Sequence, residues 1–304
     1  MSRIDEALKR ASGAAIEDPK IAARADCLRE TDDAALQHYA AESGVFHIHA
    51  AAPDPLPRRS SAVARPSGRA GWLTDPSEFA GKLVVSEGAS PLAIEQYRRL
   101  AGTIHEIQAE RGLKTLMVTS AIPNEGKTLT VSNLALTLSE SYRRRVLLID
   151  ADLRRPMIHE LFQVGNDQGL GEVLRSAGGE IPFRQVSENL TVLPAGEVDQ
   201  PLEGLTSEAM RALLARCAET FDWVLLDAPP VGMMPDARLL ASLTRAVLFV
   251  IAARSTPHQV VTRALAAFDP DSLVGTVLNR VQERDIPETD YYKDYYYATT
   301  RRAQ

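Results

Sequence analysis

The stretch TLMVTSAIPNEGKT, residues 115–128, decides the fold of this chain. Its first five residues form a continuous apolar run, which is typical of a parallel strand covered on both faces. The rest carries the pattern [AG]-x4-G-K-[ST] from Ala121 to Thr128, and a helix is expected to begin at Lys127. Such a loop wraps a phosphate with successive backbone N–H groups, while the following helix points its positive N-terminus at the same anion. We therefore predict a nucleotide site here rather than an ordinary turn between a strand and a helix.

The residue types within this loop suit separate tasks. Gly126 allows the backbone to approach a phosphate closely, Lys127 is expected to bridge the β- and γ-phosphates, and the Thr128 hydroxyl is expected to bind Mg²⁺. The predicted nucleotide-contacting residues of the loop are Ala121, Pro123, Asn124, Glu125, Gly126, Lys127 and Thr128.

Outward from this loop, short apolar runs alternate with helical segments, which indicates an α/β fold with a doubly wound, mostly parallel sheet. A first helix is expected between the N-cap Ser90 and the stop signal Gly112. The predicted strands are 115–119, 146–149, 190–193, 223–226, 246–252 and 274–278, and further helices are expected over 127–140, 206–219 and 258–268.

Acidic residues follow two of these strands. Asp150 and Asp152 lie in VLLIDADLRRP (146–156), and Asp227 lies in WVLLDAPPVG (223–232). The carboxyl ends of parallel strands share one crevice with the phosphate loop. Each residue alone suits a helix N-cap, but three together fit a Mg²⁺ shell better, because this ion prefers oxygen ligands.

A polar pair follows the last predicted strand. The amide of Asn279 is a candidate for reading a base edge, and Arg280 is grouped with it as a nucleotide contact. The alternative for Asn279 is a loop-capping role, which is common for asparagine at such positions.

Composition excludes several classes of protein. The chain has 304 residues, 45% apolar content and a formal net charge of −6, which disfavours nonspecific nucleic-acid binding. Its two cysteines lack metal-like spacing. The N-terminus lacks the apolar region of a secretory signal, and the longest apolar run, 246–253, is short of the roughly 20 residues needed to span a bilayer. We therefore predict a cytoplasmic protein without a direct membrane span.

Three regions are expected. Residues 1–82 form an Ala-rich extension that we expect to be flexible, with short helices and a Pro-rich linker; residues 83–283 form the nucleotide-binding domain; and residues 284–304 form a tail. Five of the eight tyrosines lie in that tail: Tyr291, Tyr292, Tyr295, Tyr296 and Tyr297.

The motifs TSAIPNEGKT, LLIDADLRRP, VLLDAPPV and GTVLNR, followed by the tyrosine cluster, together resemble the bacterial tyrosine kinases of polysaccharide export in their separate cytoplasmic form. This family is a branch of the MinD/ParA-like P-loop NTPases. MinD/ParA-type loops carry an extra lysine five positions before the loop lysine, where this chain has Ile122. A loop without that lysine, followed by a tyrosine tail, fits phosphoryl transfer to a phenol.

The resemblance implies an ATP- and Mg²⁺-dependent autokinase whose phosphoacceptors are the tail tyrosines. It implies that Lys127 neutralises phosphate charge, that Asp152 and Asp227 position the metal, and that Asp150 accepts the tyrosine proton, with Asp150 and Asp152 interchangeable in these roles. It further implies a homo-oligomer, and recruitment to the inner face of the cell membrane by the cytoplasmic segment of a membrane polysaccharide chain-length (copolymerase) protein.

One departure concerns assembly. The family motif E-x-x-R-x-x-R reads Glu95, Arg98 and Ala101 here, so its last arginine is absent. This departure argues against a ring of subunits. Two other functions compete with the kinase: an ATP-driven switch or scaffold, for which this departure and the N-terminal extension leave room, and a binding module whose tail is modified by another kinase.

Overall fold

The computed structural model describes residues 45–48, 82–86, 89–175, 181–197, 205, 207–232 and 236–281, with backbone alone for the first segment. The tyrosine cluster and most of the N-terminal extension, including its predicted helices and linker, lie outside these residues.

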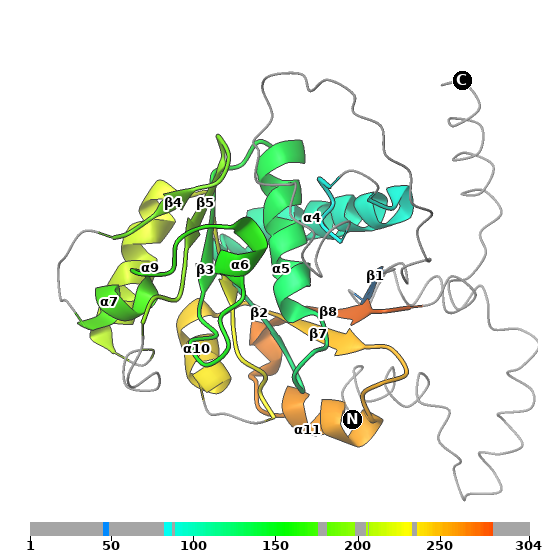
Figure 1. The fold of residues 1–304 in the computed structure, drawn as a ribbon. Helices are drawn as coiled ribbons and strands as arrows, with labels where there is room; N and C mark the ends of the chain where they lie inside the picture. The colour runs from blue at the N-terminus through cyan, green and yellow to red at the C-terminus, as the bar shows by residue number, and fades with distance from the viewer. Residues whose placement is uncertain are drawn as a thin grey trace, which may run out of the picture.

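The described residues form an eight-stranded sheet in the order β1-β8-β7-β2-β6-β3-β5-β4 (Figure 1). Neighbouring strands run parallel throughout, except that β4 is antiparallel to β5. The strands are β1 (Val45–Ile48), β2 (Thr115–Ser120), β3 (Val146–Asp150), β4 (Arg184–Gln185), β5 (Leu190–Leu193), β6 (Trp223–Asp227), β7 (Val247–Ala252) and β8 (Leu273–Asn279).

Helices cover both faces of this sheet, which confirms the predicted doubly wound α/β class. One core packs α4 (Pro91–Arg111), α5 (Lys127–Leu136) and α6 (Ile158–Phe162) against one face. A second core packs α7 (Leu170–Arg175), α9 (Glu208–Thr220), α10 (Asp236–Thr244) and α11 (His258–Leu265) against the other.

The continuous apolar runs follow from this two-sided burial. Leu116 and Val118 of β2 enter the first core, and Met117 between them enters the second. Since successive side chains of a strand point to opposite faces, each position must be apolar when both faces are covered. All six predicted strands are present.

The predicted ends of the first helix are confirmed. The Ser90 side chain accepts a hydrogen bond from the backbone N–H of Ala93, and Gly112 ends α4 in the left-handed conformation at φ 65°. Among the residues buried on this helix are Tyr97, Leu100 and Ala101. Ala101 therefore lies in the core and not on the surface. The family motif has arginine at this position.

The helix predicted over 127–140 is altered near its end. The α-helical part stops at Leu136, and a π-helical turn, η2 (Thr137–Ser141), continues it. The Thr137 hydroxyl donates to the carbonyl oxygen of Asn133, at 2.8 Å, which is a bond known to disturb the backbone ladder of a helix.

Several short elements were not predicted. β1 lies in the N-terminal extension, for which the sequence predicts only helices and a linker. It pairs in parallel with β8, from Val45↔Thr276 to Ile48↔Asn279. β4, α6, α7 and α10 were also missed. Segments this short carry too few residues to display a period, so tertiary contacts decide them.

Candidate functional site

The candidate site lies where the carboxyl ends of three adjacent strands meet the phosphate loop. The strand order places β2 beside β6, and β6 beside β3. Asp150 is in register with Asp227 across β3 and β6, and Val118 is in register with Asp227 across β2 and β6. The loop that follows β2 therefore passes directly beside the predicted acidic residues.

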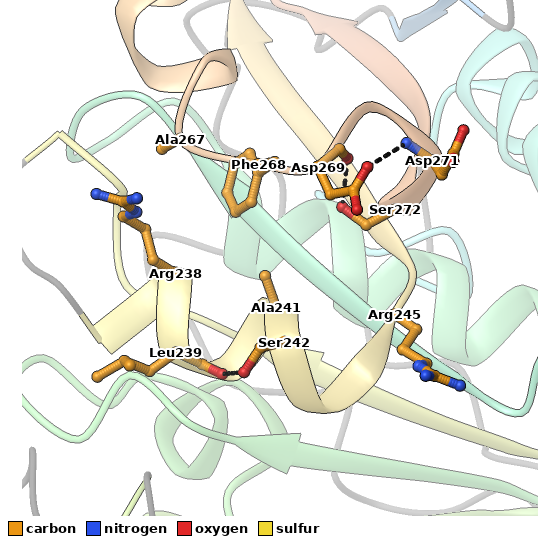
Figure 2. A pocket seen from close by; sticks show the side chains of 10 residues that line it. All are labelled: Arg238, Leu239, Ala241, Ser242, Arg245, Ala267, Phe268, Asp269, Asp271 and Ser272. Atoms are coloured by element: carbon orange, nitrogen blue, oxygen red, sulfur yellow. Dashed lines mark hydrogen bonds between the residues drawn. The ribbon is translucent and has the colours of Figure 1, made fainter.

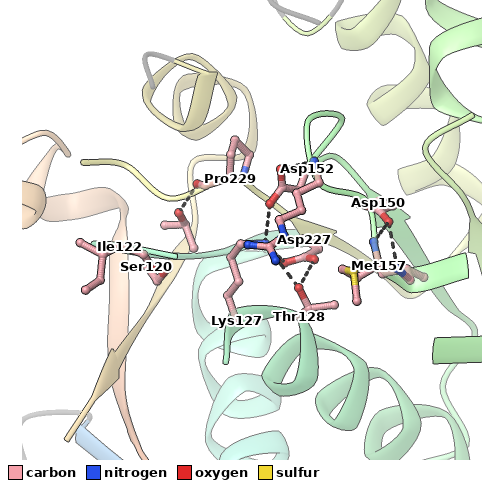
Figure 3. A network of polar contacts seen from close by, with 12 residues as sticks. Ser120, Ile122, Lys127, Thr128, Asp150, Asp152, Met157, Asp227 and Pro229 are labelled. Carbon is pink, nitrogen blue, oxygen red and sulfur yellow. Dashed lines mark hydrogen bonds and ion pairs between the residues drawn. The ribbon is translucent and has the colours of Figure 1, made fainter. Parts of the chain in front are cut away.

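Lys127 is the centre of a polar network (Figure 3). Its Nζ lies 2.7 Å from Oδ2 of Asp152 and 3.3 Å from Oδ1 of Asp227. The Thr128 hydroxyl donates to Oδ2 of Asp227 at 2.6 Å. Four of the predicted site residues thus form one connected cluster, although they come from two strand ends and a helix start.

Burial makes these charges interdependent. Burial lowers the pKa of Lys127, but the negative charges of Asp227 and Asp152 outweigh that effect, so its pKa is raised overall. Burial raises the pKa of Asp227, and Lys127 offsets part of this rise. The ammonium therefore stabilises the charged carboxylates in a site that is largely closed to water.

Asp150 differs from Asp152 in its surroundings. Its Oδ2 accepts hydrogen bonds from the backbone N–H groups of Met157 and Ile158, both at 3.0 Å, while its buried Oδ1 has no hydrogen-bond partner among the described residues. Burial, followed by the charge of Asp227, raises the pKa of Asp150 well above its usual value. Asp152 instead contacts Lys127 with one oxygen and accepts from the Arg155 N–H with the other.

The phosphate loop has a defined backbone shape. Asn124 and Gly126 take left-handed conformations, with φ of 65° and 96°. A Cβ atom on Gly126 would lie 2.0 Å from Nδ2 of Asn279, so the glycine is required by both conformation and space. Pro123 and Asn124 are exposed at the outer turn of the loop. Ala121 is buried, and its carbonyl accepts from the Gly232 N–H at 3.1 Å.

The pair after β8 holds the loop. The Asn279 amide donates to the carbonyl of Glu125 at 2.8 Å, and its Oδ1 accepts from the Arg280 N–H. The Arg280 guanidinium donates to the carbonyl of Asn124 at 2.6 Å. These contacts match the loop-capping alternative for Asn279 and leave its amide engaged with the protein.

The site's fit to a metal can be judged from its donors. Within the described ranges, no group of three or more His, Cys, Asp or Glu side chains is arranged to hold an ion. Mg²⁺, however, is usually bound by one or two carboxylates together with substrate phosphates and water. Thr128 and Asp227, in contact at 2.6 Å and beside Lys127, fit that donor set.

A second recess lies elsewhere and contains none of the predicted residues (Figure 2). It is formed between α10 and the loop before β8, with Arg238, Leu239 and Phe268 among its lining residues. We place the candidate site at the phosphate loop because the buried charged groups and the glycine loop are there.

Some residues of the site were missed in the sequence. Thr256 and the backbone N–H of Ala252 bind the Glu125 side chain, and the hydroxyl of Thr119 donates to the carbonyl of Pro229 at 2.7 Å. Pro229 directly follows the DA of the second acidic motif, which is a weak signal for it. Nothing in the sequence pairs Glu125 with a residue more than 100 positions away.

A strand, a glycine-containing phosphate loop, a helix and an acidic neighbouring strand end define a P-loop nucleotide-binding protein. No protein-family model matches the chain. It is 33% identical over 203 residues to the tyrosine-protein kinase YwqD of Bacillus subtilis (strain 168), a match that covers 65% of this chain and 85% of YwqD. The chain belongs to the bacterial tyrosine kinases, as the motifs predicted.

Two further similarities agree with this family. The chain is 30% identical over 234 residues to the succinoglycan biosynthesis transport protein ExoP of Rhizobium meliloti (strain 1021), covering 73% of this chain but 29% of ExoP. Its fold is similar to the kinase domain of the Escherichia coli tyrosine kinase ETK, with a TM-score of 0.61 and 30% identity, over 65% of this chain and 79% of that domain. Within the described residues, no helix is both long and apolar enough to cross a membrane.

Proposed function

We propose that this chain is an ATP-dependent protein-tyrosine autokinase that phosphorylates its own tyrosine tail. The observation that supports this most is the cluster of Lys127, Thr128, Asp152 and Asp227 at the start of α5, with Nζ–Oδ distances of 2.7 and 3.3 Å. Phosphoryl transfer depends mainly on positioning and on neutralising charge, and this cluster supplies both.

Lys127 is the residue that receives the phosphates. In the structure its ammonium lies beside two carboxylates and offsets part of their charge, and a triphosphate in the loop would offer it oxygens of higher charge. An ammonium carries three N–H donors, so Lys127 can bind phosphate oxygens while keeping one carboxylate contact. The loop amides and the N-terminus of α5 add positive potential at the same place.

Thr128 and Asp227 are the groups that would hold Mg²⁺, with Asp152 as the second carboxylate. The bound ion would neutralise charge on the phosphate oxygens during transfer. The 2.6 Å bond between the Thr128 hydroxyl and Asp227 holds these two oxygens next to each other, where one ion could contact both.

Asp150 is our candidate for the proton acceptor of the tyrosine hydroxyl. Its Oδ1 is uncommitted among the described residues, and the raised pKa makes the ionised carboxylate a stronger base. Asp152 is the alternative, although both of its oxygens are already engaged. Asp150→Asn and Asp152→Asn separate the two: the base variant loses transfer while keeping Mg·ATP affinity, and the metal variant loses Mg²⁺ affinity.

The acceptors are tyrosines of the tail. Tyr291 lies twelve positions beyond Asn279, the last residue of β8. That stretch reaches about 40 Å when fully extended, which is enough for a neighbouring copy's crevice. Each added phosphate brings a charge of about −1.5 to −2 and would repel the tail from a site of buried carboxylates. Phosphorylation would thereby release a tail-bound homo-oligomer.

The biological setting is proposed from the relatives. ExoP is named for succinoglycan biosynthesis and transport. By analogy, this kinase would regulate polymerisation or export of an extracellular polysaccharide. A membrane chain-length protein would recruit it to the inner face of the cell membrane through its cytoplasmic segment.

One assay tests this function. The protein is incubated with Mg²⁺ and γ-labelled ATP, with and without the partner's cytoplasmic segment, and the label is mapped by mass spectrometry. We expect label on residues 291–297, which Lys127→Met abolishes. Replacing all five tail tyrosines by Phe should remove the label but leave ATP affinity unchanged. Phosphate release without label would instead support an ATP-driven switch, and neither signal would support a binding module.

A further inference from the structure

Glu125 is a buried carboxylate within a loop that is built to bind an anion. Its side chain is 1% exposed. A negative charge at this place opposes a triphosphate by simple repulsion. The hydrogen bonds of Glu125 explain why a carboxylate stands at this position.

Three donors surround this carboxylate. Oε2 accepts from the backbone N–H of Ile122 at 2.8 Å. Oε1 accepts from the backbone N–H of Ala252 at 3.0 Å and from the Thr256 hydroxyl. The first contact ties the loop to its own beginning, and the other two tie it to the end of β7 and the connection that leads to α11.

These bonds explain how an irregular loop keeps its shape without nucleotide. The Ile122 N–H points at the carboxylate and not into the phosphate site. On the opposite side, Asn279 holds the carbonyl of Glu125 at 2.8 Å. The side chain and the carbonyl of one residue are thus fixed by β7 and by β8, so Glu125 determines where the loop amides point.

We infer that Glu125 is a positioning residue, and not a nucleotide ligand, and that Thr256 of the β7–α11 connection acts on the phosphate loop through the Glu125 carboxylate. This inference rests on the proposed function and proposes for Glu125 a different role from the nucleotide contact that the motif predicts. It adds the 252–256 segment to the site as a support for the phosphate loop.

The test uses four single variants of the full chain and one double variant, Glu125→Ala with Thr256→Val. Glu125→Ala removes the carboxylate, Thr256→Val removes one donor, and Thr256→Ser keeps the hydroxyl. Ser255→Ala is the matched control, because among the described residues its hydroxyl contacts the Ala253 carbonyl alone, at 3.4 Å. Two quantities are measured: the Kd for Mg·ATP, and amide hydrogen exchange of the 120–128 segment without nucleotide.

We expect Glu125→Ala to weaken Mg·ATP affinity about tenfold, with a smaller loss for Thr256→Val, as for buried hydrogen bonds to charged groups. Thr256→Ser and Ser255→Ala should bind like the parent chain. Thr256→Val should have no further effect in the Glu125→Ala background, because it acts through that carboxylate. Both Glu125→Ala and Thr256→Val should speed exchange in the 120–128 segment.

Equal affinity of Glu125→Ala and the parent, or an additive Thr256→Val effect in the double variant, would overturn the inference. Should Glu125→Ala fail to fold, Thr256→Val and its hydrogen exchange carry the test. A parent chain that binds no Mg·ATP would instead contradict the proposed function, and the exchange experiment would still decide whether the carboxylate holds the loop.

Discussion

Lys127 and Asp227 are 100 positions apart in the chain, and their side chains meet at 3.3 Å between Nζ and Oδ1. The first belongs to the helix that follows the phosphate loop, and the second ends a neighbouring strand. Because this ion pair is buried, the loss of Lys127 would change both the charge of the site and the folding stability of the protein.

Replacing Lys127 by Met should reduce stability as well as activity. Removing one partner of a buried ion pair leaves uncompensated charge, which typically costs about 3–5 kcal/mol. Urea unfolding at neutral pH measures this cost. Lys114→Met, at an exposed lysine, is the control and should change stability little. An unaltered urea midpoint for Lys127→Met would show that the buried pair contributes nothing.

Replacing Thr128 by Val should raise the Mg²⁺ concentration needed for activity. The variant loses the hydroxyl that contacts Asp227 at 2.6 Å while keeping nearly the same volume. Thr128→Ser keeps the hydroxyl and should restore the parent's Mg²⁺ dependence. The measurement is initial phosphorylation rate against Mg²⁺ at fixed ATP. If Thr128→Val and the parent chain showed the same Mg²⁺ dependence, Thr128 would not be a ligand of the metal.

Replacing Asn133 by Ala should detach residues 82–86 from α5. The Asn133 Oδ1 accepts from the Val84 N–H at 2.9 Å, and its Nδ2 donates to the Lys82 carbonyl at 3.0 Å. The two bonds are partly buried, and the variant leaves both backbone groups without these partners, so we expect about 1 kcal/mol of destabilisation. Faster proteolysis near residue 84 would accompany it. Gln259→Ala, on the exposed side of α11, is the control.

The thiol of Cys217 should be unreactive in the folded protein. Burial raises its pKa from 9.0 to about 11. In a Cys27→Ala background, Ellman's reagent at pH 8 should modify Cys217 only after unfolding. Because the folded pKa is the higher one, the thiol's contribution to stability is complete below pH 9.0 and is lost as pH rises toward about 11. Cys217→Ala should lack this part of the pH dependence, and rapid native labelling would contradict the burial.

Local rules were sufficient for much of this fold. The continuous apolar runs identified every strand of the described sheet except β1 and β4. A strand that is covered on both faces is apolar at every position, so it does not alternate between apolar and polar residues. Ser90 and Gly112 marked the ends of α4, since capping depends on the residue's own side chain and conformational freedom. The loop from Ala121 to Thr128 was recognisable because phosphate binding restricts residue types at adjacent positions.

Only the tertiary structure decided which distant groups meet. Strand order brings Asp150, Asp152 and Asp227 to the carboxyl end of the sheet. Their contacts nevertheless differ, because Asp150 accepts from the backbone amides at the start of α6, whereas Asp152 contacts Lys127. The tertiary structure also lets the Asn279 amide donate to the carbonyl of Glu125. The carboxylate of Glu125 accepts from three donors that lie in two separate segments. Such pairings depend on register and packing between remote segments, and a single sequence carries no local pattern for them. By itself the sequence therefore determined the class of site, whereas long-range packing determined the role of each residue within it.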